Sequence, residues 1–218
     1  MKRNDTLDRI RKTGIVPVIR ARSGEEARNV VDAVYKGGID IIELTMVVPG
    51  AVELIKELSE RFGDDVVVGA GTVLDAETAR ACMLAGAKFV VSPSLDLRTV
   101  ECCNTYGVPV FPGALTPTEI LTAWRAGATM VKVFPASAMG GASYIKGLKA
   151  PFPQLELVPT GGVNVSNAAD FIAAGAAAVG AGADLVTAAP GEDLTESITK
   201  KAKQYIQEIE QARMKRRT

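Results

Sequence analysis

The sequence predicts a (β/α)8 (TIM) barrel that forms a single domain over residues 1–218. Three observations predict this fold class: eight short apolar or β-branched runs, helix-like segments between them, and a uniform composition without a long linker. One repeat of strand and helix takes roughly 25 residues, as a βα unit of a barrel does. An open, doubly wound parallel sheet is the alternative.

The eight runs are typical of strands buried on both faces, and most of them end in Gly or Pro. In chain order the expected strands occupy residues 15–20, 39–45, 66–72, 89–93, 108–114, 130–136, 155–161 and 177–182.

The segments between these runs carry apolar residues at helical spacing, as in GEEARNVVDAVYKGG and TPTEILTAWRAGA. Several begin with a capping residue near an acid, such as Ser23, Asp75 or Thr116, and several close on glycine. The last helix is expected to start near Glu192 and to run into the basic C-terminal tail.

The composition excludes several classes of function. The chain has 218 residues and no histidine, which removes Ser-His-Asp and Cys-His nucleophiles, imidazole bases and histidine metal sites. Its 25 Lys+Arg balance 25 Asp+Glu, so no overall charge favours nucleic acid or an anionic membrane. We therefore expect a small-molecule partner, and no metal or cofactor.

Targeting and redox signals indicate a cytoplasmic protein. The basic N-terminus is not followed by an apolar segment, and the Ala/Gly-rich run 171–183 is too short to span a bilayer. The three cysteines, Cys82, Cys102 and Cys103, form neither a disulfide framework nor a CxxC metal motif, and we expect them to be reduced packing residues.

Strand parity predicts which side chains point into the barrel. On the sixth run, Val131 and Val133 suit the helix layer, so Lys132 should point inward. On the second run, Glu43 and Thr45 have the inward parity. Arg20 has it at the end of the first run. The sequence thus places an amine, a carboxylate and a guanidinium at one barrel mouth.

This set of groups points to Schiff-base chemistry. Burial favours the neutral form of an amine, and a neutral amine attacks a carbonyl to give an electron-withdrawing iminium. A neighbouring carboxylate moves protons as a carbon–carbon bond breaks or forms. From parity alone, a structural ion pair between Lys132 and Glu43 is an equal alternative.

The surrounding motifs resemble the family of 2-keto-3-deoxy-6-phosphogluconate (KDPG) and 4-hydroxy-2-oxoglutarate aldolases. In that family's order, and over nearly the whole chain, they are VPVIRA, GGIDIIELT, VGAGTVLD, FVVSPSLD, FPGALTPTE, VKVFPAS, PFPQLELVPTGGV and VGAG. The resemblance implies that Lys132 forms the Schiff base and that Glu43 is the general acid/base. It also implies a substrate-binding set of Arg20, Thr45, Thr72, Pro93, Phe134, Thr160, Gly161, Gly162 and Gly182, in which Thr72 holds the pyruvyl carboxylate.

The implied reaction is metal-independent cleavage of KDPG, or a close 2-keto-3-deoxy sugar acid, to pyruvate and an aldehyde such as glyceraldehyde 3-phosphate. The galactonate epimer and 4-hydroxy-2-oxoglutarate remain alternative substrates, and the family typically forms homotrimers. Phosphosugar isomerases also use barrels, but those rely on histidine. A barrel kept only as an assembly scaffold is a further alternative.

Two positions depart from the family pattern. Many members have an arginine shortly after the second-strand threonine to bind the carboxylate, whereas this chain has Met46, Val47 and Val48. Arg20 could supply that charge. Ala183 replaces a serine that is common at the phosphate site, so we expect weaker phosphate binding there.

Overall fold

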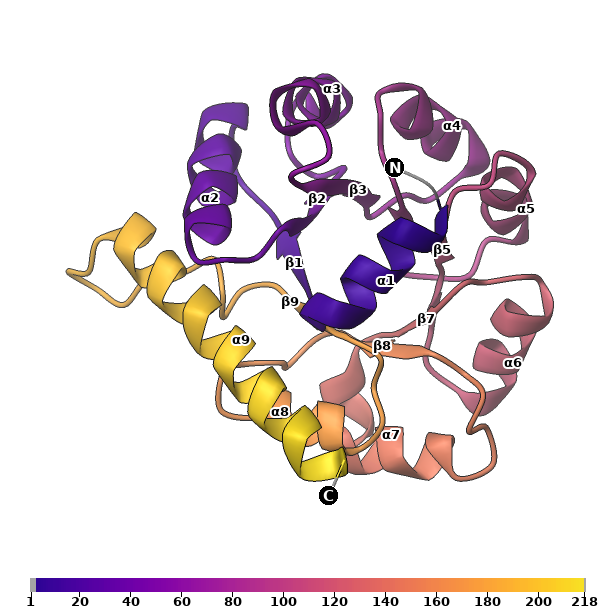
Figure 1. The fold of residues 1–218 in the computed structure, drawn as a ribbon. Coiled ribbons are helices and arrows are strands. Elements are labelled where there is room, and N and C mark those ends of the chain that lie inside the picture. Colours follow the sequence, from indigo (N-terminus) through magenta and orange to yellow (C-terminus); the bar gives the residue numbers. More distant parts are fainter. Residues whose placement is uncertain (1–2, 218) are drawn as a thin grey trace.

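The computed structural model describes residues 3–217 as an α/β structure in which parallel strands curve around a common interior (Figure 1). Helices α2 to α9 lie around the outside of the strands. In chain order the elements are α1 (Arg3–Thr13), β1 (Ile15–Ile19), α2 (Gly24–Lys36), β2 (Ile41–Thr45), α3 (Ala51–Phe62), β3 (Val67–Gly71), α4 (Ala76–Leu84), β4 (Val90–Val91), α5 (Leu97–Thr105), β5 (Val110–Phe111), β6 (Gly113–Ala114), α6 (Pro117–Arg125), β7 (Val131–Val133), the 3-10 helix η1 (Ala136–Met139), α7 (Ala142–Lys149), β8 (Leu157–Pro159), α8 (Ala168–Ala173), β9 (Val179–Ala181) and α9 (Leu194–Arg217).

The strands form two parallel sheets. One has six strands in the order β5-β4-β3-β2-β1-β9, and the other has three in the order β6-β7-β8. An isolated parallel bridge between Thr160 and Gly180 connects the end of β8 to β9. Because β1 pairs with both β2 and β9, the first and last strands of the chain are neighbours. The structure thus confirms a parallel α/β fold of curved sheets.

Each of the eight predicted runs contains a strand, but the fifth is divided into β5 and β6 at Pro112. Proline has no N–H group to donate to a ladder. The two halves also pair with different neighbours, both in parallel: β5 pairs with β4 on one side, and β6 pairs with β7 on the other. The Pro112 carbonyl still accepts a hydrogen bond from the Lys132 N–H at 3.0 Å.

The predicted caps position the helices that follow the strands. The side chains of Ser23 and Asp75 accept hydrogen bonds from backbone N–H groups in the first turns of α2 and α4. Thr116 and Glu119 form a complete capping box at the start of α6. These contacts satisfy N–H groups that a helix start leaves without intrahelical partners.

Helix α1 lies across one end of the strands, at their N-terminal side (Figure 1). It buries Leu7 and Ile10, and it leads through Gly14 directly into β1. Three arginines hold it to separate parts of the ring: Arg3 donates to Thr129 at 2.9 Å, Arg9 to Asp40 at 2.5 Å and Arg11 to Glu156 at 2.8 Å. The sequence analysis predicted neither this helix nor η1, whereas α7 lies between the sixth and seventh runs, where the barrel repeat predicts a helix.

Glycines on β3 make room for large side chains inside the ring. A Cβ atom added at Gly69 would lie 2.3 Å from the ring of Phe89, which is fully buried and stacks on Phe111 at a centroid distance of 5.6 Å. Real Cβ atoms do not approach that closely, so a side chain at position 69 would displace this aromatic pair.

Within the described residues, no helix combines the length and apolar character that crossing a membrane requires.

We predict that Gly69→Ala lowers the free energy of unfolding by about 1–3 kcal/mol, because the added methyl group overpacks the interior against Phe89. Gly147→Ala is the matched control: that glycine is exposed in α7, and its added Cβ would contact nothing within 4 Å. The control should be neutral or stabilising by up to about 1 kcal/mol. Urea unfolding of both variants is the measurement, and equal stability of the two would contradict the packing argument.

Candidate active site

Lys132 on β7 and Glu43 on β2 meet inside the ring, as strand parity predicts. Their side chains are each 3% exposed, and Nζ of Lys132 lies 3.7 Å from Oε1 of Glu43. This is an ion-pair distance but is too long for a hydrogen bond. Oε1 of Glu43 is buried and has no hydrogen-bond partner among the described residues.

The space for the Glu43 carboxylate comes from the neighbouring strand. Glu43 pairs in register with Gly69, and Thr45 pairs with Gly71. A Cβ atom at Gly71 would lie 2.2 Å from Oε1 of Glu43. A larger residue on this face of β3 would therefore push the carboxylate out of position.

Burial raises the pKa of the Glu43 carboxyl above that of an ordinary glutamate. The positive charges of Lys132 and Arg20 oppose this shift, but the cost of removing the carboxylate from water outweighs them. A carboxyl with a raised pKa is suited to give and take protons near neutral pH.

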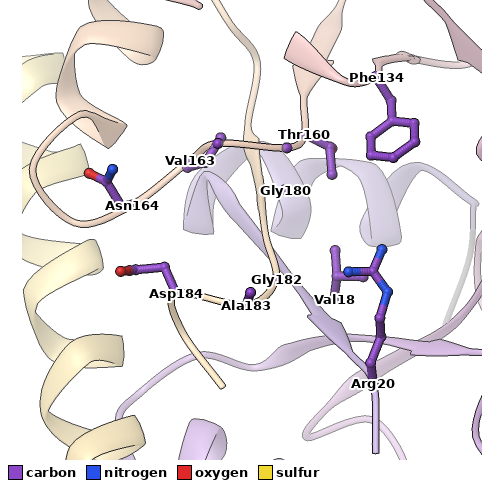
Figure 2. Close-up of a pocket in the computed structure, with 12 residues that line it drawn as sticks. Val18, Arg20, Phe134, Thr160, Val163, Asn164, Gly180, Gly182, Ala183 and Asp184 are labelled. Carbon is purple, nitrogen blue, oxygen red and sulfur yellow. The ribbon is translucent and has the colours of Figure 1, made fainter. Parts of the chain in front are cut away.

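A cavity of about 330 Å³ opens beside this pair, at the carboxyl ends of β1, β7, β8 and β9 (Figure 2). Phe134 lies between the cavity and the Lys132–Glu43 pair: its ring lines the cavity, and the ring centroid lies 5.3 Å from Nζ of Lys132. The cavity is lined by Val18, Arg20, Phe134, Thr160, Gly161, Gly162, Val163, Asn164, Gly180, Gly182, Ala183 and Asp184.

Six residues of the sequence-predicted site lie on this wall, namely Arg20, Phe134, Thr160, Gly161, Gly162 and Gly182. Lys132 and Glu43 are buried and are not part of the wall, but each adjoins a wall residue: Lys132 lies near the ring of Phe134, and Glu43 pairs in register with Val18. The cavity wall also lacks Thr45, Thr72 and Pro93.

Thr45 and Thr72, which do not line the cavity, differ in burial and in backbone conformation. Thr45 is fully buried, and its hydroxyl donates to the carbonyl of Ile19 at 2.7 Å, so this group joins β2 to β1. Thr72 is half-buried and has a positive φ of 57°, which is unfavourable for a β-branched residue. Such strained backbone concentrates at functional sites.

Arg20 stands at the end of β1, and its guanidinium points toward the side of the cavity where Phe134 and Thr160 lie (Figure 2). It forms no hydrogen bond or ion pair with any residue that the structure describes. A Cβ atom at Gly182 would lie 3.3 Å from its Nη1 atom. Arg20 is thus a cation free to bind an anion at the β1–β9 side of the cavity.

Two residues of the cavity wall, one after β8 and one after β9, have unpaired backbone N–H groups in the described part of the chain. Those of Gly162 and Ala183 have no acceptor among residues 3–217, and Gly162 has a φ of 76° that favours glycine. Free N–H groups beside a cation form a site for an oxyanion such as phosphate. In the same described part of the chain, no group of three or more Cys, Asp or Glu side chains could hold a metal ion.

The sequence analysis did not predict Val18, Val163, Asn164, Gly180 or Asp184 as cavity residues. Four of them carry a usable signal, because Val18 and Gly180 have inward parity and Asn164 and Asp184 follow strand ends. Met46 is one of the three residues that the sequence analysis placed where many family members have an arginine. Its Sδ atom lies 3.5 Å from Sγ of Cys82, in the layer behind the strands.

Comparison with known proteins gives consistent matches. Residues 7–200 match the model of the family described as KDPG and KHG aldolase. The chain is 38% identical to the 2-dehydro-3-deoxy-phosphogluconate aldolase of Treponema pallidum over 169 residues, which cover 78% of this chain and 79% of that protein. It is 36% identical to the 2-dehydro-3-deoxy-6-phosphogalactonate aldolase of Escherichia coli over 185 residues, covering 84% and 90% of the two chains.

A solved structure of KDPG aldolase from Legionella pneumophila, with pyruvate captured as a covalent carbinolamine intermediate, superposes with a TM-score of 0.81. The match covers 91% of this chain and 96% of that one, at 28% identity.

We predict that carbon-13 NMR titration places the pKa of Glu43 above the value of an ordinary glutamate, about 4.3. Replacing the amine in Lys132→Met should raise it further, because the ion pair favours the charged carboxylate.

Glu119 serves as the internal reference for that titration. Backbone hydrogen bonds at the start of α6 lower its pKa, and the substitution at Lys132 should leave it unchanged. A Glu43 pKa at or below the ordinary value, or one that falls in Lys132→Met, would show that burial is not the dominant effect.

Proposed function

The chain belongs to the KDPG and KHG aldolase family and is an aldolase, and from this premise we propose that Lys132 and Glu43 carry its reaction. The observation that supports this assignment is the buried approach of the two groups, 3.7 Å apart, beside a cavity that can admit a keto acid. The structural ion pair that parity left open is thereby the less favoured interpretation, since Oε1 of Glu43 lacks a hydrogen-bond donor.

In the proposed mechanism, Nζ of Lys132 attacks the C2 carbonyl of a 2-keto-3-deoxy acid and forms a carbinolamine. Glu43 donates a proton as the C2 hydroxyl leaves as water, which gives the iminium. The carboxylate then removes the proton of the C4 hydroxyl, the C3–C4 bond breaks, and its electron pair enters the iminium to give an enamine and an aldehyde. Protonation at C3 and addition of water at C2 release pyruvate and restore the amine.

We propose a phosphorylated sugar acid, KDPG or its galactonate epimer, as the substrate. The free N–H groups of Gly162 and Ala183 and the unpaired guanidinium of Arg20 suit a distal phosphate. Arg20 shares the cavity with these groups, so we assign it to the distal end of the substrate instead of the carboxylate. The strained Thr72 remains our proposed ligand for the carboxylate, and Pro93, whose backbone lies against Gly113, remains a proposed substrate-binding residue.

A second candidate substrate is 4-hydroxy-2-oxoglutarate, which has no phosphate. Ala183 favours it, because the cavity lacks the hydroxyl donor that a serine would provide at that position.

We further propose that the two sheets represent one (β/α)8 barrel domain over residues 1–218. The bridge between Thr160 and Gly180 supports closure on one side, and the single residue Pro112 separates the sheets on the other.

We also propose a cytoplasmic homotrimer. Unpaired Cys82, Cys102 and Cys103 suit a reducing compartment. Exposed apolar side chains in the segments that follow β2, β3 and β4 support burial between subunits: Val47 is 56% exposed, Leu74 is 60%, and Leu97, the first residue of α5, is 52%.

Incubation with pyruvate and sodium borohydride should add a stable mass to the peptide that contains Lys132, because reduction converts the Schiff base to a secondary amine. Lys132→Met should acquire no label and should cleave substrate at least about a thousandfold more slowly. The exposed Lys146 is the internal control, detected by the same peptide mass spectrometry. An unlabelled Lys132, or equal labelling of Lys146, would refute the proposed nucleophile.

Ala183→Ser should lower KM for KDPG roughly tenfold, because a new hydroxyl can donate to the charged phosphate. The same change should leave KM for unphosphorylated 2-keto-3-deoxygluconate unaltered. Ala189→Ser places a hydroxyl at an exposed position that does not line the cavity, and it should have no effect on either substrate. Steady-state cleavage coupled to pyruvate detection gives KM for the wild type and both variants. An equal change of KM for the two substrates in Ala183→Ser would argue against phosphate binding at this position.

A further inference from the structure

Tyr205 is a fully buried tyrosine of α9 that the proposed chemistry does not use. Its hydroxyl donates to Oδ2 of Asp184 at 2.8 Å and also lies 3.4 Å from the carbonyl oxygen of Val163. Burial, followed by the contact with Asp184, raises the pKa of this phenol, so it remains a donor at physiological pH.

The two partners of Tyr205 belong to the two segments that line the distal side of the cavity. Val163 follows β8, and Asp184 follows β9. One helical turn before Tyr205, Nζ of Lys201 donates to the carbonyls of Asp184 at 2.6 Å and Thr187 at 2.9 Å. Helix α9 therefore holds both segments from behind the cavity.

The direction of the Asp184 side chain matters because it is negatively charged and adjoins Ala183. Figure 2 shows its carboxylate pointing away from Arg20, toward the pale yellow helix. The Tyr205 hydroxyl and the N–H of Val165, at 3.3 Å, hold it in that direction. A carboxylate that turned into the cavity would instead repel an anion near the free N–H of Ala183 and compete for Arg20.

We infer that Tyr205 is a positioning residue for substrate specificity: by holding the Asp184 carboxylate outward, it keeps the distal end of the cavity able to accept a phosphate dianion. This inference rests on the proposed function, and it names phosphorylated keto acids as the substrates that depend on the contact. Tyr205 acts through Asp184 and touches no substrate atom.

The test compares KDPG with 2-keto-3-deoxygluconate, its unphosphorylated counterpart, in Tyr205→Phe. Losing one hydrogen bond should raise KM for KDPG about three- to tenfold, while kcat for KDPG and both constants for the unphosphorylated acid change less than about twofold. Tyr144→Phe is the matched control, because that hydroxyl also donates to a loop carbonyl, that of Leu115, which does not line the cavity. The control should leave the ratio of the two KM values unchanged.

A double substitution separates charge from packing. Asp184→Asn removes the negative charge at nearly unchanged side-chain size, so Tyr205→Phe combined with Asp184→Asn should restore KM for KDPG to within about twofold of the wild-type value. If Tyr205→Phe does not fold, Asp184→Glu provides a second test, since the added methylene displaces the carboxylate from the position in which Tyr205 and Val165 bind it, and it should also raise KM for KDPG alone.

The outcomes are distinguishable. Equal changes for both substrates, no change, or failure of the double variant to recover would overturn the role of Tyr205 while leaving the aldolase assignment intact. A wild-type protein that cleaves neither substrate would overturn the proposed function, and this inference with it.

Discussion

The approach of a lysine and a glutamate inside the ring is the constraint on which the rest of the structure depends. Lys132 and Glu43 come from strands that do not pair with each other, so only the curvature of the sheets brings them together. Removing such charges from water costs on the order of several kcal/mol per ion. Two features accommodate the pair: Gly71 leaves space for the carboxylate, and Lys132 partly offsets the shift that burial imposes on Glu43. A site this dry keeps electrostatic effects strong, which suits proton transfer.

The regular part of the fold could be predicted from the sequence because strands buried on two faces leave a continuous apolar signal. The division at Pro112 has a local cause as well, but the choice of a different partner strand on each side of it depends on the curvature. Helix α1 escaped prediction because it buries only a few residues, such as Leu7 and Ile10, and is otherwise polar. Its position is fixed by arginine contacts over more than a hundred residues of sequence, which no local pattern reveals.

The candidate site also has a part that the sequence predicts and a part that it does not. Parity on two short strands was enough to place Lys132 and Glu43 inward, because side-chain direction alternates along a strand. Parity does not tell which inward group is engaged with backbone, as the hydroxyl of Thr45 is with Ile19. It also does not extend into the loops after the strands, where Asn164 and Asp184 lie. Those positions depend on α9, the last element of the chain.

Helix α1 closes the interior of the ring at the amino-terminal ends of the strands. Because α1 covers the amino-terminal side of the strands, the cavity described above opens at their carboxyl ends, where the substrate of the proposed reaction would enter. In the proposed reaction, the phosphorylated fragment would bind near Gly162 and Ala183 on the cavity wall, and the three-carbon fragment would be bonded to the more deeply buried Lys132. On the proposed mechanism, the aldehyde would therefore leave before pyruvate, and the water that releases pyruvate would enter through the space that the aldehyde had occupied.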